Sequence, residues 1–192
     1  MNNHSAEPRP PTDSGVIEYV VKPDGTVVEI RGIWDDFART NGAGGLTIAN
    51  VVGHDLCDFV SGPATRLVYD ALIERVGRTR APIHFTFRCD APDVRRHMRM
   101  DVMGDGSENV RFSSRIVSEE PRPRQALLST DVDRSDVTVV MCSWCKRVKQ
   151  DDNWVEVEEY VESTGLMEEE RFPQLSHGLC PECAAKMEAL ID

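Results

Sequence analysis

The sequence predicts an α+β fold: an antiparallel sheet with helices on one face, followed by a small C-terminal α/β module. One observation is the order of the segments, with short helices and one longer helix standing between two groups of strand-like runs. Helices grouped between antiparallel strands favour a single sheet that is covered on one face. A second observation is a pair of Cys-x-x-Cys motifs in the last third of the 192-residue chain.

The first half begins with two strand-like runs, 16–21 and 26–31, separated by Lys22-Pro23-Asp24-Gly25. Proline, aspartate and glycine in this order are typical of a tight turn, so the two runs predict a hairpin. Residues 33–40 predict a short helix, which the glycine-rich stretch 41–45 ends.

A longer helix is predicted to start at Ser61-Gly62-Pro63, because proline is well tolerated in a first helical turn. Apolar residues recur at helical spacing behind this start, which indicates one buried face. They are Leu67, Val68, Ala71, Leu72 and Val76.

Three further strands are predicted, over 83–88, 95–102 and 109–117. In the first two of them apolar and polar residues alternate, as expected when one face of a sheet is buried. The apolar side chains on this face are interpreted either as plain core or as the lining of a small-ligand cavity, and the sequence leaves both open. They are Phe85, Phe87, Met98, Met100 and Phe112.

Composition divides the chain into four parts. Residues 1–14 are polar and proline-rich and are predicted to be a flexible tail. Residues 15–118 form the sheet domain, and 119–137, with Pro121 and Pro123, are predicted to be a linker in which Leu127 and Leu128 supply one docking point. Residues 138–192 form the metal-binding module.

The order of elements in 16–118, with the stretch 52–60 leading into the longer helix, resembles that of a PAS sensory domain. The resemblance implies a sensor or dimerisation domain, and with it a homodimer as one expected association. PAS domains can enclose a cofactor such as haem or flavin, and each of these would need particular ligand or contact residues.

Neither cofactor is expected. The helical stretch 63–78 has no histidine to serve as an axial haem ligand, and His84 and His97 alternate with the apolar side chains and so point outward. His54 is the remaining candidate ligand, although a lone histidine is more often a loop or surface residue. The segment around Cys57 loosely resembles the reactive-cysteine loop of LOV photosensors, but the run 109–117 has no glutamine to contact a flavin ring. Cys57 is therefore interpreted as a buried small apolar residue.

The two Cys-x-x-Cys pairs, Cys142 with Cys145 and Cys180 with Cys183, predict a structural zinc site. Each short turn can aim two thiolates at one centre, and two turns complete the tetrahedron that zinc prefers. Four protein ligands leave no position for a reactive water, so a catalytic zinc is not expected. A redox role for one pair is an alternative, although the strand-to-helix context of thioredoxin-like motifs is missing.

His177 leaves the ligand set open, because it precedes Cys180 by three residues. It is either a ligand in a Cys₃His site or, as preferred here, a neighbour that donates to a sulfur or packs beside the four cysteines.

The stretch Cys142 to Val148, with Trp154 and the string Ser-His-Gly-Leu-Cys-Pro-Glu-Cys at 176–183, resembles a small zinc-binding module of bacterial signalling proteins. There the module tends to follow PAS or response-regulator domains. The resemblance implies a metal and a signalling context, and it implies no reaction.

Charge and motifs then exclude several function classes. The net charge is −11, and residues 138–192 hold five basic and twelve acidic side chains, so nucleic acid is disfavoured as a partner. No nucleophile–base motif or phosphate-binding loop is present, so no enzymatic activity is expected. No apolar run is long enough to span a membrane and the first residues do not resemble a signal peptide, which predicts a cytoplasmic protein.

We therefore expect a bacterial signal-transduction protein in which a PAS-like domain is coupled to a zinc module that contacts a protein partner. Two alternatives stay open. One is a zinc-dependent DNA-binding regulator that uses Lys146, Arg147 and Lys149. The other is a thiol redox switch that releases its zinc on oxidation.

Overall fold

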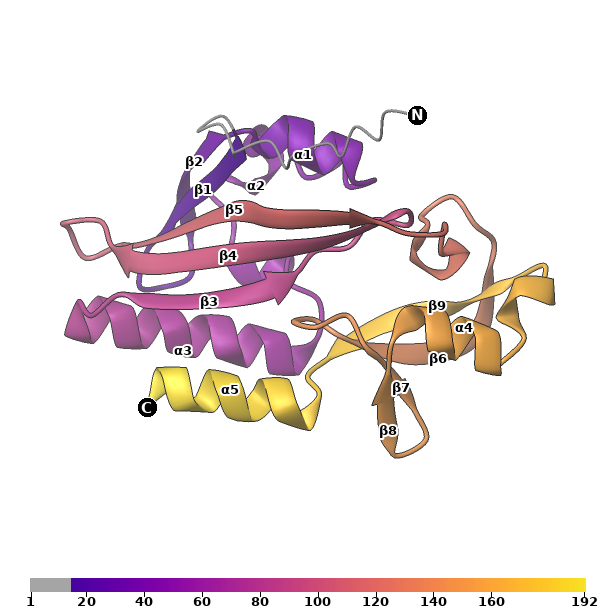
Figure 1. Cartoon of the computed structure of the whole chain (residues 1–192). Helices are drawn as coiled ribbons and strands as arrows, with labels where there is room; N and C mark the ends of the chain where they lie inside the picture. The colour runs from indigo at the N-terminus through magenta and orange to yellow at the C-terminus, as the bar shows by residue number, and fades with distance from the viewer. Residues whose placement is uncertain (1–14) are drawn as a thin grey trace, which may run out of the picture.

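The computed structural model describes residues 15–192 and confirms the α+β class (Figure 1). The predicted tail 1–14 lies outside the described residues. Two sheets organise the chain, a five-stranded antiparallel sheet and a four-stranded sheet in which one strand pair is parallel.

The first sheet has the strand order β2-β1-β5-β4-β3, so β2 and β3 are its edges. The predicted hairpin is present, and Gly25 occupies its turn with a φ of +89°, a conformation that favours glycine. The strands are β1 (Val16–Val21), β2 (Val27–Gly32), β3 (Ile83–Arg88), β4 (Val94–Gly104) and β5 (Val110–Pro121).

The helices of this half lie between β2 and β3, as predicted. Proline opens the long helix, Gly62 precedes it at a φ of +88°, and the helix runs two residues beyond Gly77. The elements are α1 (Trp34–Thr40), α2 (Ile48–Val51), the 3-10 turn η2 (Leu56–Asp58) and α3 (Pro63–Thr79).

The second sheet has the order β8-β7-β6-β9, and β6 and β9 run parallel. The elements of this part are β6 (Arg134–Cys142), β7 (Val148–Gln150), β8 (Asn153–Val155), α4 (Val157–Ser163), the 3-10 turn η4 (Leu166–Glu168), β9 (Phe172–Gly178) and α5 (Pro181–Ile191).

A short strand precedes helix α4. Asn153 to Val155 form a strand that pairs with β7, and the helix begins only at Val157. The apolar spacing of Val157, Tyr160 and Val161 was helical, but the strand in front of it depends on pairing that a local pattern does not reveal.

The segment predicted as a linker is partly structured. Its first three residues, Glu119 to Pro121, end β5 and pair with β4, and a 3-10 turn η3 (Ala126–Leu128) follows. Leu127 is fully buried and packs with Met141, Val148 and Val157 in a small core of the second sheet. The predicted docking point thus holds the connection against the metal-binding module.

The main core belongs to both halves of the chain. Buried residues of the first sheet and α3 form one cluster with residues from the end of β6 and from α5. Those contributed by the C-terminal part are Cys142, Trp144, Cys180, Cys183 and Met187. Figure 1 shows α5 running beside α3, and the two helices are in contact. The metal-binding part is therefore packed onto the sheet domain rather than tethered to it.

The predicted apolar face lies where the alternation placed it. Met98, Met100 and Phe112 are buried, and Phe85 and Phe87 pack at the edge of the same core. Phe112 stacks on Tyr19 with a centroid distance of 5.0 Å, so side chains fill the space in front of the central strands. Among the described residues no helix is long and apolar enough to cross a membrane.

Candidate metal centre

The structure brings the four predicted cysteines to one point. Cys142 ends β6, Cys145 closes the turn behind it, Cys180 caps the N-terminus of α5 and Cys183 lies in the first turn of that helix. Their four Sγ atoms all lie within 4.8 Å of one another. Within residues 15–192 this is the one group of three or more such side chains that is compact enough to hold a metal ion.

The spacing of the sulfurs fits a tetrahedral ion. Zinc–sulfur bonds of about 2.3 Å give a tetrahedron whose sulfur–sulfur edges are about 3.8 Å long. The Cys145 and Cys180 sulfurs are 3.8 Å apart. All four thiols are free, and a disulfide would need a separation of about 2 Å.

Backbone amides already point at the sulfurs. The amide of Cys180 donates to the Cys142 sulfur and the amide of Cys183 donates to the Cys180 sulfur, each over 3.4 Å. Such bonds stabilise thiolates, which are the form that binds a metal. The hydrogen bond from the Cys145 thiol, helped by backbone amides and opposed by burial, lowers the pKa of Cys142 to about 4.

The Cys145 and Cys183 thiols do not lose their protons in the same way without a nearby cation. The hydrogen bond to Cys142 and burial raise the pKa of Cys145 far above its usual range, and burial together with the Cys142 charge raises the pKa of Cys183 to about 12. Four thiolates in this space repel one another, so a bound cation has to supply the opposite charge. The donor set therefore fits a soft or borderline divalent metal.

His177 is not part of the compact sulfur group. It lies on β9 opposite Met141, and burial, followed by the nearby charge of Lys146, lowers its pKa. A neutral, half-buried imidazole next to the cysteine turn suits a packing or hydrogen-bonding neighbour of the four sulfurs.

The turn between the first two cysteines is held on both sides. The amide of Lys146 donates to the Cys142 carbonyl over 3.0 Å and the amide of Cys142 donates to the Arg147 carbonyl over 2.8 Å. Lys146 adopts a φ of +61° to close this turn, and its ammonium donates to the Ser143 carbonyl.

Trp144 stands between Cys142 and Cys145 in the sequence, and its side chain extends into the sheet domain. Its side chain is buried with its ring centroid 5.9 Å from Phe85 and 6.2 Å from Tyr69 of α3. Its carbonyl accepts a 2.7 Å hydrogen bond from the amide of Arg88 at the end of β3. The sequence motif gave no sign of this role, because the partners of Trp144 lie more than fifty residues away in the chain.

Two polar contacts join the same two parts. The hydroxyl oxygens of Thr65 and Ser143 lie 2.6 Å apart, and the Arg75 guanidinium donates to the Ile191 carbonyl over 2.7 Å. The metal centre is thus attached to α3 through its first cysteine turn and again through the end of α5.

A buried ion network lies beside this attachment. Asp90, whose side chain is 1% exposed, pairs with Arg88 and with Arg122. Arg88 also binds Glu156 over 2.6 Å, and Arg122 binds Glu158 over 3.2 Å, both carboxylates lying at the start of α4. The network therefore holds the start of α4 against β3 and against the segment 119–137 that was predicted to be a linker.

The sequence also predicts that several arginines of β3, β4 and β5 gather on one outer, solvated face, and the structure separates them into two groups. They are Arg88, Arg95, Arg96, Arg99, Arg111 and Arg115. Arg88 and Arg96 are buried, and Arg96 binds Glu119 and Asn41. The others lie on polar surfaces, where Arg99 and Arg115 bind Asp101 and Arg111 lies 3.7 Å from Glu18. Acidic partners within the sheet thus balance this face, which agrees with a solvated surface rather than an anion site.

His84 and His97 stand on the outer side of β3 and β4, opposite the apolar face, as expected. Cys57 is a correction, because it is half-buried rather than buried. Its thiol donates to Asp70 over 3.5 Å, and burial followed by the Asp70 charge raises the pKa of Cys57 to about 11. A protonated thiol on an acidic surface does not resemble a reactive cysteine.

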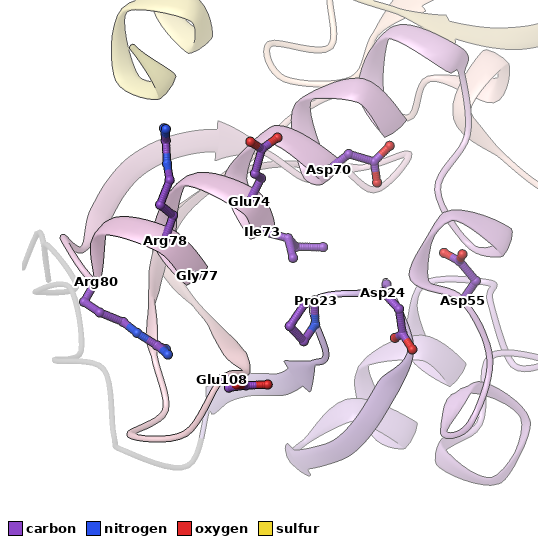
Figure 2. Close-up of a pocket in the computed structure, with 11 residues that line it drawn as sticks. Pro23, Asp24, Asp55, Asp70, Ile73, Glu74, Gly77, Arg78, Arg80 and Glu108 are labelled. Carbon is purple, nitrogen blue, oxygen red and sulfur yellow. The ribbon is translucent and has the colours of Figure 1, made fainter.

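A hollow beside α3 is acidic, and none of the four clustered cysteines lines it. It has a volume of about 590 Å³, and Figure 2 shows its side chains spread around it between α3 and the β1–β2 hairpin. Asp24, Asp55, Asp70, Glu74 and Glu108 line it together with Arg78 and Arg80. In the described part of the chain these carboxylates do not form a compact ligand group.

Comparisons with known proteins give the following. Neither protein-family profiles nor curated proteins provide a match to this sequence. The solved structures that match include the PAS domain of the RpfR quorum-sensing receptor of Cronobacter turicensis, with 9% identity over 56% of this chain and 98% of that one and a TM-score of 0.44. A second is the PAS domain of BvgS of Bordetella pertussis, with 20% identity over 60% and 82% of the two chains and a TM-score of 0.38.

A third is the Aer2 receptor of Vibrio cholerae, described as a dual PAS-haem oxygen sensor, with 13% identity over 54% and 95% of the two chains and a TM-score of 0.37. The matched structures are thus PAS domains, and each match spans little more than half of this chain. At these scores the likeness adds nothing to the argument from the residues themselves.

Proposed function

We propose that this chain is a signal-transduction protein in which a PAS-like sensor or dimerisation domain and a zinc-stabilised module act as one unit that contacts a protein partner. The observation that carries the proposal is the position of Trp144 between the metal centre and the sheet domain. Because the tryptophan stands between two sulfur ligands and packs on Tyr69 and Phe85, a change at the metal centre moves a core residue of the sensor domain.

Zinc is the metal that the site fits best. Four cysteine sulfurs at tetrahedral spacing are a preferred set for structural zinc, and four protein ligands leave no open position for chemistry. Cys142, Cys145, Cys180 and Cys183 would hold the ion, and the ion would supply the charge that four neighbouring thiolates require. No enzymatic role is proposed.

A protein, rather than nucleic acid, is the proposed partner. In the basic run beside the metal centre Arg147 is already paired, since it binds Glu182 over 3.0 Å and lies 3.5 Å from Glu156. Twelve acidic against five basic residues in 138–192 further oppose a polyanion. A second copy of the chain, joined through the PAS-like domain, is the other association that we expect.

The coupling is tested by amide hydrogen exchange on the full chain, with zinc bound and after removal of zinc by a chelator. We expect faster exchange in α3 around Tyr69 and in β3 around Phe85 after zinc is removed, while the β1–β2 hairpin changes little. Unchanged exchange in α3 and β3 would show that the two parts respond independently and would reject the proposal.

A redox switch is a second candidate, favoured by the position of Cys145 and Cys183 at the wall of an open groove. A peroxide could take two electrons from two of the thiolates there, forming a disulfide and water and releasing the zinc. Retention of zinc after mild peroxide treatment would exclude this candidate.

A further inference from the structure

A groove runs between the edge strand β3 and helix α5, next to the metal centre. It has a volume of about 560 Å³, within the range of ligand-binding clefts. Its apolar lining is Phe85, Phe87, Trp144, Met187, Ala189 and Leu190, and Cys145 and Cys183 form part of one wall.

The strand that borders the groove has free backbone groups. Cys89, just past β3, donates its amide to the Arg96 carbonyl of β4, whereas Arg88 donates its amide away from β4 to the Trp144 carbonyl. Since backbone direction alternates along an antiparallel strand, the amides and carbonyls of Thr86 and His84 also point away from β4. Both residues are exposed, and within residues 15–192 these groups have no hydrogen-bond partner.

The bond from Arg88 to Trp144 shows that this edge already accepts a neighbouring segment at one end. The cysteine turn covers the edge at Arg88 and leaves it open at Thr86 and His84. An unpaired strand edge with apolar side chains beside it is the surface to which an extended peptide adds as a further strand.

The charges around the groove indicate which peptide fits. All charged or titratable side chains other than thiols in its lining are basic, namely His84, Arg88, His97 and Lys186, although the whole chain has a net charge of −11. Arg88 is engaged by Asp90 and Glu156, and His84 by Asp101. Lys186 is 66% exposed and pairs only with Glu182 on its own helix. The groove therefore suits a segment with acidic side chains.

We propose that the β3–α5 groove binds an extended acidic segment of a partner protein, which pairs with the backbone of His84 and Thr86. Alternate side chains of the segment are apolar and lie against Phe85 and Phe87, and the acidic ones between them lie near His84 and His97. This proposal rests on the proposed function, because it specifies how the module contacts its protein partner.

The test uses the full chain loaded with zinc and two sets of nine-residue synthetic peptides. One set alternates glutamate with valine, and the other alternates lysine with valine. Binding is measured by fluorescence anisotropy, and the contacted residues are located by amide exchange. We expect the glutamate set to bind, the lysine set to bind at least about tenfold more weakly, and exchange to slow at His84 and Thr86.

Backbone pairing is tested on the peptide side, which leaves the fold of the protein untouched. N-methylation of every second amide should abolish binding in one register and leave it nearly unchanged in the other, because only alternate amides face the strand edge. A Lys186→Glu variant should weaken the glutamate set at least about threefold, and Lys149→Glu, an exposed charge on β7, should not.

Three results would each overturn the proposal. The two N-methylated series could bind equally well, or peptide binding could slow exchange only on the α3–α5 surface. The third is that the glutamate set does not bind. Self-association through β3, seen as a mass twice that of the chain together with slowed exchange at Thr86, would replace the partner by a second copy and would also overturn it. If the peptide binds but amide exchange in α3 and β3 does not change when zinc is removed, the groove proposal stands and the proposed coupling is rejected. If exchange in α3 and β3 changes with zinc but the peptide does not bind, only the groove proposal is rejected.

Discussion

The backbone of Gly62 touches the backbone of His177. A Cβ atom at Gly62 would lie 2.3 Å from the His177 carbonyl oxygen, far closer than any real contact. Gly62 precedes α3 and His177 lies on β9, so this contact joins the start of the long helix to the strand that leads into the second cysteine pair. No bulkier residue can stand at this point while the two parts stay docked.

Gly62→Ala should therefore destabilise the protein, because the added methyl group collides with backbone atoms that cannot rotate away. Gly53→Ala is the matched control, since Gly53 has a similar φ of +91° but open space around its Cβ position. We expect Gly53→Ala to cost about 1 kcal/mol from backbone strain and Gly62→Ala at least about 2 kcal/mol more. Urea denaturation of both variants measures the difference, and equal losses would disprove the contact.

Each cysteine of the centre should be needed for the metal. Cys180→Ser removes one sulfur, its 3.8 Å contact with the Cys145 sulfur and the hydrogen bond that it accepts from the Cys183 amide. The zinc content should therefore fall from about one ion per chain to well below that. Cys57→Ser, outside the cluster, should retain the full content. Elemental analysis of both purified variants measures the zinc content per chain. A full zinc content in Cys180→Ser would favour His177 as the ligand that replaces Cys180.

The clustering of the four cysteines could be predicted from the sequence because its information is local. Two short turns with two cysteines each specify a tetrahedral site wherever the chain between them runs. The alternation in β3 and the proline at the start of α3 likewise depend on neighbouring residues, and both elements were found as predicted.

The docking of the module could not be predicted in this way. Trp144 appeared to be part of the cysteine motif, and only the fold brings it to Phe85 and Tyr69. Arg88 appeared to be one member of an exposed arginine cluster, whereas Asp90 and Glu156 bury it. Both outcomes depend on pairing between distant segments, and composition and periodicity do not contain that pairing.

Trp144→Ala should cost about 3–5 kcal/mol of stability, because it leaves a cavity between the metal centre and α3. Trp154→Ala on β8 is the control, since Trp154 is only partly buried and should cost clearly less. Chemical denaturation of the zinc-loaded variants gives both values. A loss at Trp144 no larger than that at Trp154 would mean that the tryptophan does not join the two parts.

Asp90→Asn should be among the most destabilising changes of a charged residue. It removes the carboxylate that lies between Arg88 and Arg122 and leaves both guanidinium groups buried with less opposite charge. The expected loss is about 3–5 kcal/mol. Asp36→Asn, whose side chain is 75% exposed and pairs with Arg39, should change stability by no more than about 0.5 kcal/mol. Similar thermal midpoints for the two variants would contradict a buried network.

Asp101 should contribute stability that is lost in acid. Burial acts to raise the pKa of Asp101, but hydrogen bonds from Arg99 and His84 outweigh it, and the pKa is lowered in the folded protein. A carboxyl group whose folded pKa lies below its unfolded value of about 3.9 stabilises the fold above that value, and the contribution falls as the pH drops through the folded pKa.

Asp101→Asn should therefore be less stable than the wild type by about 1–2 kcal/mol at pH 5, with a clearly smaller difference at pH 3. Asp131→Asn serves as the control, because Asp131 is 74% exposed and lies 3.4 Å from Arg124, so its difference should stay small at both pH values. Urea denaturation at the two pH values measures both gaps. A gap for Asp101→Asn that is the same at pH 3 and pH 5 would show that the arginine and histidine around Asp101 do not hold it ionised in the folded state.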